Sequence, residues 1–230
     1  MTEPIRAGTA KAERTREQIV TAAMRLFREQ GYQGTTMRGV AAEAGVSVGN
    51  AYYYFASKEQ LVQGYYDHMA AEQAARCQQL FANTSDFAER LHGSLLIWLE
   101  VAQPYHQFAG TFFATAAQPG NPLSPLSEAS TPAREIMLAM YRELITGSST
   151  RAGAELSEVL PELLWLYQLG VILYWVHDTS PDLARTHQLI EHTVPIIARL
   201  VRLSRLAVIR PLSRQAADLV TMLRSHHPAS

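Results

Sequence analysis

The apolar positions of this sequence repeat with the spacing of helices, and no segment alternates apolar and polar residues in the way of a strand. The first helix is predicted from Arg16 to Gly31, where a glycine can take the left-handed conformation that ends a helix. Its apolar face is formed by Ile19, Ala22, Ala23, Leu26 and Phe27.

Two short helices are predicted next. Thr35 or Thr36 offers a hydroxyl that caps a helix of barely two turns. Gly45 can end this helix without steric cost, and Ser47 is a natural cap for a further helix over residues 48–55. Two helices of this length around one glycine have the spacing of a helix-turn-helix.

The rest of the chain is predicted as long helices separated by polar or proline-containing breaks. We expect them over residues 58–81, 86–102, 104–117, 133–145, 155–177, 181–205 and 213–224, with a kink at Pro195. Four of the eleven prolines lie between residues 119 and 132, so this segment is the longest predicted loop. It is expected to be disordered, with gating of a ligand entrance as the alternative. The pattern as a whole predicts an all-α fold.

The second helix of a helix-turn-helix enters the major groove of DNA. Small side chains at its start let the backbone approach base edges, and Asn50 can bond adenine in bidentate fashion. The tyrosines behind them, together with Lys58 at the start of the next helix, are placed to bind phosphate oxygens. The candidate DNA-binding residues from this pattern are Ser47, Val48, Gly49, Asn50, Tyr52, Tyr53, Tyr54 and Lys58.

The aromatic residues of this segment have a second interpretation, because successive aromatic residues on a helix can also be core residues. Phe55 is expected in the core, whereas Tyr53 is expected to face DNA. A lysine at the start of a helix is unfavourable against the helix macrodipole. The position of Lys58 therefore indicates a requirement other than helix stability.

The sequence of residues 15–62, TREQIVTAAMRLFREQGYQGTTMRGVAAEAGVSVGNAYYYFASKEQLV, closely resembles the DNA-binding domain of TetR/AcrR-type transcriptional regulators. The paired threonines, the AGVS turn, the YYYF segment and the SKE cap occur in the order and spacing of that family. The resemblance implies an all-α protein with a disordered arm over residues 1–14 and a three-helix helix-turn-helix domain over residues 15–62. A helical ligand-binding and dimerisation domain over residues 63–230 would follow.

The resemblance also implies roles for individual residues. Arg38 and residues 48–50 would reach the bases, while Thr36, the three tyrosines at 52–54 and Lys58 would hold phosphates. Ala51 departs from the larger aliphatic residue that is common at its position, which would loosen the packing of the recognition helix.

Composition and charge narrow the class of protein. The single cysteine, Cys77, excludes a disulfide framework and a cysteine-built zinc module. Residues 1–60 carry eight Lys or Arg against six Asp or Glu, and the two lysines of the chain, Lys11 and Lys58, both lie there. No apolar stretch reaches the ~20 residues of a membrane span, and the charged N-terminal residues do not resemble a secretory signal. A cytoplasmic protein with no membrane partner is expected.

A homodimer is expected because one short recognition helix discriminates too few base pairs to find an operator. Two copies related by a two-fold axis would read a roughly palindromic double-stranded DNA operator. Residues 155–177 carry two apolar stripes, of which one can face the core and the other a partner; the alternative is a helix buried wholly in its own domain. The interface is expected at Val159, Leu163, Leu166, Gly170, Leu173, Leu189, Ile196 and Leu200.

Ten of the 20 aromatic residues lie between Trp98 and Trp175, which indicates an apolar ligand cavity. The candidate ligand-binding residues are Trp98, Tyr105, His106, Phe108, Phe112, Tyr141, Trp165, Gln168 and Trp175. The sequence thus predicts a ligand-responsive transcriptional regulator, a repressor in the commoner case, that a small apolar or aromatic effector releases from DNA. No cofactor is expected.

Two other classes remain as alternatives. One is a nonspecific or ligand-independent DNA-binding protein. A nonspecific DNA-binding protein would need more positive charge than the net +2 of residues 1–60. A helical enzyme using the central aromatic cavity would need a catalytic group, and the sequence has no glycine-rich phosphate loop, nucleophile elbow or HExxH motif. His177 beside Asp178 is the one candidate acid/base pair. Neither a catalytic residue nor a metal site is expected.

Overall fold

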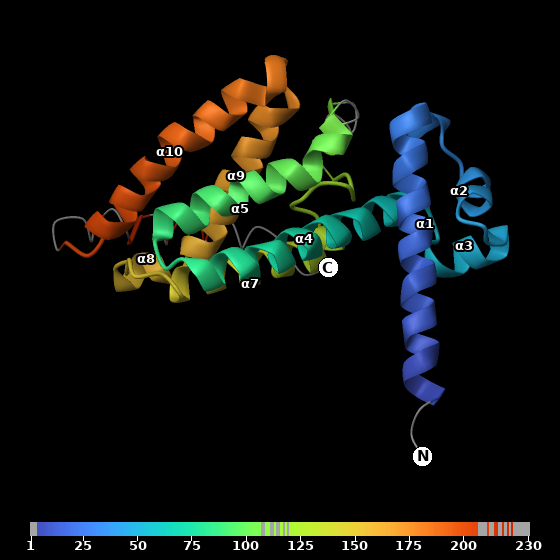
Figure 1. Ribbon diagram of the computed structural model, residues 1–230, viewed down its shortest axis with the longest axis horizontal. Helices are drawn as coiled ribbons and strands as arrows, with labels where there is room; N and C mark the ends of the chain where they lie inside the picture. The colour runs from blue at the N-terminus through green and yellow to red at the C-terminus, as the bar shows by residue number, and fades with distance from the viewer. Residues whose placement is uncertain are drawn as a thin grey trace. The chain divides into compact units, whose positions relative to one another are not determined.

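The computed structural model describes residues 4–106, 109–110, 113, 116, 118, 120–206, 211, 214–215, 218, 220 and 222. Its longer helices are α1 (Pro4–Gly34), α2 (Met37–Glu43), α3 (Val48–Tyr54), α4 (Lys58–Asn83), α5 (Phe87–Ala102), α7 (Thr131–Thr146), α9 (Leu160–Val176) and α10 (Ala184–Leu203) (Figure 1). Short helical turns are η1 (Gln103–Tyr105), η2 (Glu128–Ser130), α8 (Ala154–Ser157) and η3 (Pro181–Leu183). No strand occurs within the described ranges, and the predicted all-α class is confirmed.

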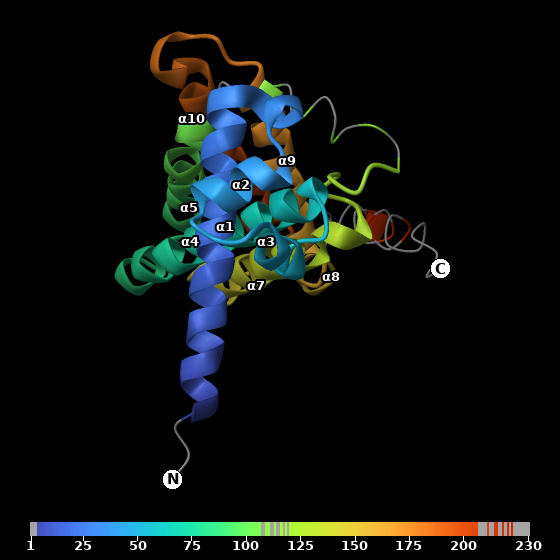
Figure 2. The same ribbon diagram turned by 90° about the vertical axis from the view of Figure 1, so that its right-hand side faces the viewer.

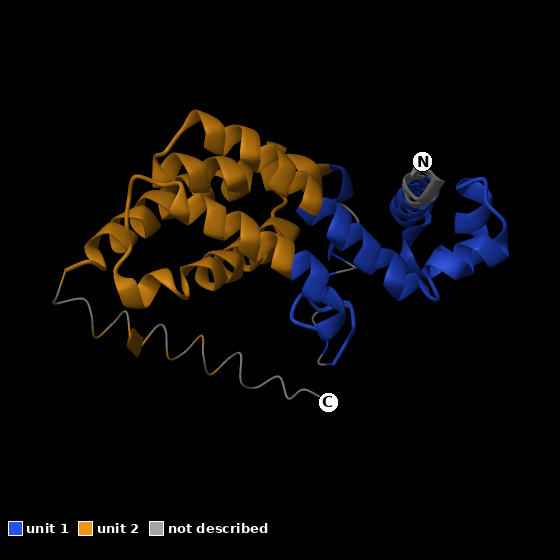
Figure 3. Ribbon diagram, turned by 90° about the horizontal axis from the view of Figure 1, so that it is seen from below, with its two compact units in different colours: residues 1–70, 104–134 blue, residues 71–103, 135–230 orange. Residues whose placement is uncertain are grey.

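The chain divides into two compact units (Figure 3). Unit 1 contains residues 1–70 and 104–134, and unit 2 contains residues 71–103 and 135–230. The boundaries predicted from the sequence lie after residues 14 and 62, and the two units differ from them. The difference arises because the segment around residues 104–134 packs with the N-terminal helices, although it lies between two helices of the second unit in the sequence.

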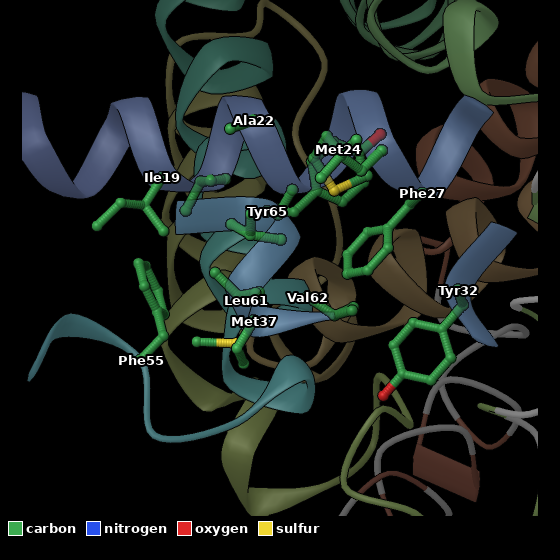
Figure 4. Packing of buried hydrophobic residues seen from close by; sticks show 14 of the residues in the cluster. Ile19, Ala22, Met24, Phe27, Tyr32, Met37, Phe55, Leu61, Val62 and Tyr65 are labelled. Atoms are coloured by element: carbon green, nitrogen blue, oxygen red, sulfur yellow. The ribbon is translucent and has the colours of Figure 1, made fainter. Parts of the chain in front are cut away.

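The core of unit 1 is built from the predicted inner faces of its helices (Figure 4). In Figure 2, α2 and α3 face the viewer and lie in front of α4. Side chains from four helices and the loop after α3 are almost fully buried: Ile19, Ala23, Phe27, Val40, Ala41, Ala51, Phe55, Leu61 and Val62. The short helix α3 therefore rests on a core formed largely by the longer helices α1 and α4.

Capping residues set the bounds of the short helices, as predicted. The Thr36 hydroxyl accepts a hydrogen bond from the backbone N–H of Gly39 (3.1 Å), and Ser47 accepts one from Asn50 (3.1 Å). Gly45 has φ +67°, the left-handed conformation that a glycine adopts at little cost. The caps at Thr36 and Ser47 therefore start α2 and α3 at the positions that the sequence predicts.

Helix α1 begins at Pro4, so the arm over residues 1–14, expected to be disordered, is helical from that residue on. Proline is favourable in the first turn of a helix, and residues 7–14 are rich in alanine and long straight-chain residues. Helix propensity accounts for this extension, because the apolar face on which the prediction was based begins only at Ile19.

Unit 2 is a helical bundle in which α10 packs against α5 and α9. Its fully buried side chains include Leu91, Leu95, Tyr141, Leu144, Leu164 and Ile190. Among the described residues, none of the helices combines the length and apolarity needed to cross a membrane.

The predicted helix over residues 155–177 is interrupted. Helix α8 ends at Ser157 and α9 begins at Leu160, because Pro161 in the first turn cannot continue a preceding helix. The predicted start at Pro181 is a short turn in which Asp182 and Leu183 have positive φ, and α10 begins after it. Pro195 lies inside α10, and the kink expected there stays a prediction. The predicted helices over residues 104–117 and 213–224 fall partly outside the described residues.

Candidate DNA-binding surface

The helix-turn-helix is closed by backbone hydrogen bonds around Gly45. The N–H of Gly45 donates to the carbonyl oxygen of Ala42 (3.2 Å), and that of Val46 donates to Ala41 (2.9 Å). Ala41 and Ala51 are fully buried between α2, α3 and the rest of the core. Small side chains allow the helices to approach closely, so the structure accommodates the alanine that departs from the family pattern.

The outward side of this motif is formed by predicted DNA-binding residues. Eight of them are exposed to solvent: Thr36, Arg38, Ser47, Val48, Gly49, Asn50, Tyr52 and Tyr53. Tyr53 is 82% exposed, which is far from the environment of a core aromatic residue. The start of α3 is unobstructed as well, because no atom lies within 4 Å of the position that a Cβ on Gly49 would occupy.

Tyr54 and Phe55 differ from the exposed tyrosines. Phe55 is buried in the unit 1 core, as expected, and the guanidinium of Arg16 lies over its ring at 5.2 Å. Tyr54 is half-buried against the same core, with its ring 5.2 Å from that of Tyr53. The structure thus places Tyr54 less favourably for DNA contact than its two neighbours.

Lys58 is held by the end of α1. Its Nζ donates to the carbonyl oxygen of Tyr32 (2.9 Å) and lies 4.5 Å from the centre of the Tyr32 ring. The Tyr32 hydroxyl donates to Glu59 Oε1 (2.7 Å), and burial together with this carboxylate raises the pKa of Tyr32. Tyr32 therefore joins α1 to the start of α4. Sequence reasoning did not single out Tyr32, because its partners are more than 25 residues away.

A shallow cavity of about 390 Å³ lies between the starts of α2 and α4. Its lining includes three of the predicted phosphate contacts: Thr36, Tyr52 and Lys58. A hydroxyl, a phenol and an ammonium group around one cavity are suitable donors for a phosphate oxygen. The geometry therefore brings together, from three elements, residues that the sequence assigned to the DNA backbone.

The candidate ligand-binding residues are divided between the units. Trp98, Tyr141, Trp165, Gln168 and Trp175 are buried in unit 2, where the rings of Trp98 and Trp175 are 5.0 Å apart in an edge-to-face arrangement. Phe108 and Phe112 lie outside the described residues.

Tyr105 and His106 belong instead to unit 1. The Tyr105 ring is 4.8 Å from that of Tyr65 on α4, and the guanidinium of Arg28 on α1 lies 5.7 Å from its centre. The placement of Tyr105 is therefore that of a packing residue of the N-terminal unit. His106 is half-buried in the same unit.

Gln168 belongs to a buried hydrogen-bond network in unit 2, which we term the glutamine network: Gln73, Ser94, Tyr141 and Gln168. The two glutamine amides are paired, with Gln168 Nε2 donating to Gln73 Oε1 (3.1 Å). Gln73 Nε2 also donates to the carbonyl oxygen of Ser94 (3.0 Å), and the Tyr141 hydroxyl donates to Gln168 Oε1. Burial raises the pKa of Tyr141 well above its usual value. The network ties together α4, α5, α7 and α9.

The candidate dimer residues are mostly at the surface of unit 2. Leu173, Ile196 and Leu200 are each about half exposed. A Cβ on Gly170 would have no atom within 4 Å. Leu163, Leu166 and Leu189 are partly buried. Three other apolar residues of this region are exposed as well: Tyr174, Leu203 and Leu206.

Val159 differs from the other candidate dimer residues, because it is buried within its own unit. Tyr167 lies on α9 but is not one of the candidate dimer residues. Its hydroxyl lies 2.6 Å from Thr193 Oγ1 of α10. This contact fixes the two helices side by side.

The one candidate acid/base pair does not form in the structure. His177 Nδ1 lies 2.9 Å from the carbonyl oxygen of Leu173, whereas the Asp178 carboxylate accepts hydrogen bonds from Ser180 and Thr186. Within the described part of the chain, no group of three His, Cys, Asp or Glu side chains could hold a metal ion.

Two known protein families match the sequence of this chain, one over the helix-turn-helix region and one over most of the remaining residues. Residues 19–65 match the family of bacterial regulatory proteins termed the tetR family, and residues 90–222 match the tetracyclin repressor-like C-terminal domain. The HTH-type transcriptional repressor KstR2 of Mycobacterium tuberculosis is 32% identical over 95 residues, which are 40% of this chain and 46% of that protein. The chain thus spans about half the length of the curated relatives it matches.

Solved structures extend the likeness in fold over most of the chain. A putative TetR-family regulator from Syntrophomonas wolfei has a TM-score of 0.61 at 16% identity and covers 81% of this chain and 95% of its own. FadR from Bacillus subtilis in complex with stearoyl-CoA has a TM-score of 0.57 at 20% identity and covers 77% and 97%. Since the C-terminal family match alone includes more than half of the residues, the chain belongs to the TetR family of bacterial regulatory proteins.

Proposed function

We propose that this protein is a transcriptional repressor that binds a palindromic operator as a homodimer and is released by a small, largely apolar effector. The observation that carries the proposal is the exposed outer side of α2 and α3, whose inner sides are packed in the unit 1 core. Its site of action would be the cytoplasm, where bacterial operators are accessible.

The two kinds of DNA contact come from different parts of this surface. Asn50, Gly49 and Val48 lie at the start of α3, the end of a recognition helix that reaches base edges. Asn50 is the residue suited to a bidentate contact with adenine. Thr36, Tyr52 and Lys58 surround the shallow cavity and would bind the phosphate backbone. Arg38, exposed on α2, is a further candidate for a base contact.

Dimerisation is supported by the exposed apolar side chains of α9 and α10. Leu173, Ile196 and Leu200 together form the kind of surface that a symmetric partner covers in an isologous interface. Gly170 would allow the close approach of a second helix. A dimer places two recognition helices on one operator, which supplies the discrimination that one short helix lacks.

The effector proposal is supported by the concentration of aromatic residues in unit 2 and by the relatives. The FadR structure from Bacillus subtilis contains stearoyl-CoA, a largely apolar chain with a polar head. Stearoyl-CoA is therefore the first probe to try, although the likeness to that protein is one of fold. An effector of this class would bind among Trp98, Trp165 and Trp175, and its binding would favour a conformation with lower affinity for DNA.

Selection of DNA ligands from a random pool tests the proposed function, with binding then measured on the enriched sequence. The expected enriched sequence is a palindrome. Lys58→Ala should weaken binding to every duplex about equally and reduce the salt dependence by about one phosphate contact, whereas Asn50→Ala should relax the preference at one position in each half-site.

The same assay identifies the competing outcomes. Enrichment of no common sequence would indicate a nonspecific DNA-binding protein, and equal losses on all sequences for both variants would contradict the division between base and phosphate contacts. In a further arm, saturating stearoyl-CoA should lower operator affinity. An unchanged affinity would remove acyl-CoA thioesters from the candidate effectors.

A further inference from the structure

Residues 120–130 form a braced segment, which we term the strap, and the expected disorder of this loop is not observed there. The Arg134 guanidinium donates to the carbonyl oxygens of Pro125 (3.2 Å) and Ser127 (3.3 Å). The Asn121 side chain accepts a hydrogen bond from the N–H of Leu123 (2.9 Å). Such internal bonds compensate for the absence of regular structure and hold the strap in one conformation.

The strap is attached to α4 by polar and apolar contacts, all within unit 1. The Gln63 amide engages it twice, because its Nε2 donates to the carbonyl oxygen of Pro122 and its Oε1 lies 3.0 Å from the Ser130 hydroxyl. The Tyr66 hydroxyl donates to the carbonyl oxygen of Leu123 (3.1 Å). Leu123 itself is 1% exposed and belongs to the core cluster beneath the recognition helix. We call these contacts the strap latch.

Two helices lead from the strap latch to the glutamine network. Helix α4 carries Gln63 in the latch and, about three turns later, Gln73 in the network. Helix α7 begins at Thr131, directly after the strap, and carries Tyr141. In unit 1, polar side chains of α4 therefore bind the strap that directly precedes α7. In unit 2, α4 and α7 are joined through Gln168 of α9.

The glutamine network is sensitive to change because it is buried and each side chain in it depends on the others. Gln168 has two partners, Gln73 and Tyr141, on α4 and α7. A buried polar group that loses a partner is energetically unfavourable, and this favours a movement of the helices that restores the bond. Any such movement acts on α4, which carries Gln63 and Tyr66 of the strap latch, and on α7, which directly follows the strap.

We propose that the strap latch of Gln63, Tyr66 and Leu123 is a positioning device, through which the state of the glutamine network in unit 2 reaches the DNA-binding surface. The proposal rests on the proposed function, since its readout is operator binding. Within unit 1 the latch holds the first half of α4, whose start carries Lys58 and whose buried side chains support α3. Gln63 and Tyr66 act through α4 and do not themselves contact DNA in this scheme.

A double-mutant cycle tests the coupling without an effector. Tyr141→Phe removes one hydrogen bond of the network, and Gln63→Ala opens the latch. Distant, independent substitutions change a free energy additively, with errors of about twofold in affinity. We expect Tyr141→Phe to weaken operator binding about fivefold when Gln63 is present and less than about twofold in the Gln63→Ala background. Gln168→Met is the second network variant if Tyr141→Phe does not fold.

Leu126→Ala is the matched control, because Leu126 lies in the strap but is about half exposed. The fivefold effect of Tyr141→Phe should persist in that background. The proposal is overturned if Tyr141→Phe leaves operator affinity unchanged, or weakens it equally with and without Gln63.

A second readout separates this proposal from the proposed function. If the wild-type protein selects no operator, the proposed function fails. Amide hydrogen exchange then tests whether the glutamine network is coupled to the strap latch. Increased exchange at the N–H groups of residues 123–130 in Tyr141→Phe supports the coupling. Unchanged exchange at those groups overturns it.

Discussion

Asp178 shows how one side chain can organise a connection between helices. It follows α9, and its two carboxylate oxygens accept hydrogen bonds from the backbone and hydroxyl groups of both Ser180 and Thr186. Burial alone raises the pKa of Asp178, but these four hydrogen bonds outweigh it and hold the pKa well below its usual range. The charged carboxylate thus fixes the turn from which α10 begins.

Substitution of Asp178 by Asn should lower the free energy of unfolding by about 2–3 kcal/mol at pH 7, because an amide cannot accept all four bonds. A depressed pKa in the folded state stabilises the protein above the unfolded value, near pH 4, and this contribution is lost as the pH falls below it. Urea unfolding at several pH values measures both effects. The difference from wild type should be full at pH 7 and shrink below about pH 4.

Glu191→Gln on the exposed side of α10 is the control and should change stability by less than about 0.5 kcal/mol. A difference between wild type and Asp178→Asn that stays constant from pH 7 to pH 3 would show that the carboxylate charge has no part in the effect.

At the scale of elements, Arg90 on α5 joins the ends of two other helices. Its guanidinium donates to the carbonyl oxygens of Phe81 (2.7 Å) and Thr84 (2.6 Å) near the end of α4, and to that of Leu144 (3.3 Å) near the end of α7. Arg90 is buried, and a Cβ on Gly147 would collide with it. A cation at two helix C-termini satisfies carbonyl groups that lack partners within their own helices.

Replacement of Arg90 by Met should destabilise the protein by about 2–4 kcal/mol, because several buried carbonyl groups lose their donor. Arg142→Met is the matched control on α7, since Arg142 is half exposed and lies 3.9 Å from Glu135; we expect a change of less than about 0.5 kcal/mol. Thermal and urea unfolding measure the loss of stability in both variants. Equal effects of the two substitutions would contradict the role of Arg90.

Local signals made most elements predictable from the sequence. Thr36, Ser47 and Asp86 cap their helices through hydrogen bonds to residues three positions later, so their effect is readable within a short window. Gly45 ends α2 for an equally local reason, its positive φ. The exposed face of α3 follows directly from these bounds, and the choice of Asn50, Tyr52 and Tyr53 depends on nothing farther away.

Contacts between distant residues could not be predicted in the same way. Gln63 contacts a loop 59 residues later in the chain, and Tyr105 packs on Tyr65 of α4, 40 residues earlier. Neither contact produces a periodic pattern in the sequence from which it could be predicted. The prediction of a disordered loop over residues 119–132 followed its proline content, whereas the buried Leu123 decides the outcome for the described part.

At the scale of the molecule, the residues proposed for DNA binding and those proposed for effector binding lie mostly in different units. The exposed recognition face belongs to unit 1, and the buried tryptophans and the apolar stripe of α9 and α10 belong to unit 2. The chain passes between the units at residues 70/71, 103/104 and 134/135. Two of these connections lie within α4 and α7.

Leu200, on α10, is 56% exposed in the single chain and is central to the proposed dimer surface. Leu200→Glu would place a charge in that interface, where it cannot be desolvated favourably. We expect this variant to be monomeric and to bind the operator at least about a hundredfold more weakly, because one recognition helix then binds alone. Arg199→Glu at the neighbouring exposed position is the control for the added charge.

Sedimentation velocity of the protein with its selected duplex tests most directly whether the recognition helices act in pairs. The account predicts two chains on each intact palindrome, and loss of that complex both on a duplex with one half-site scrambled and for Leu200→Glu. A stable complex of one chain per duplex, with equal affinity for the intact and the scrambled site, would contradict it.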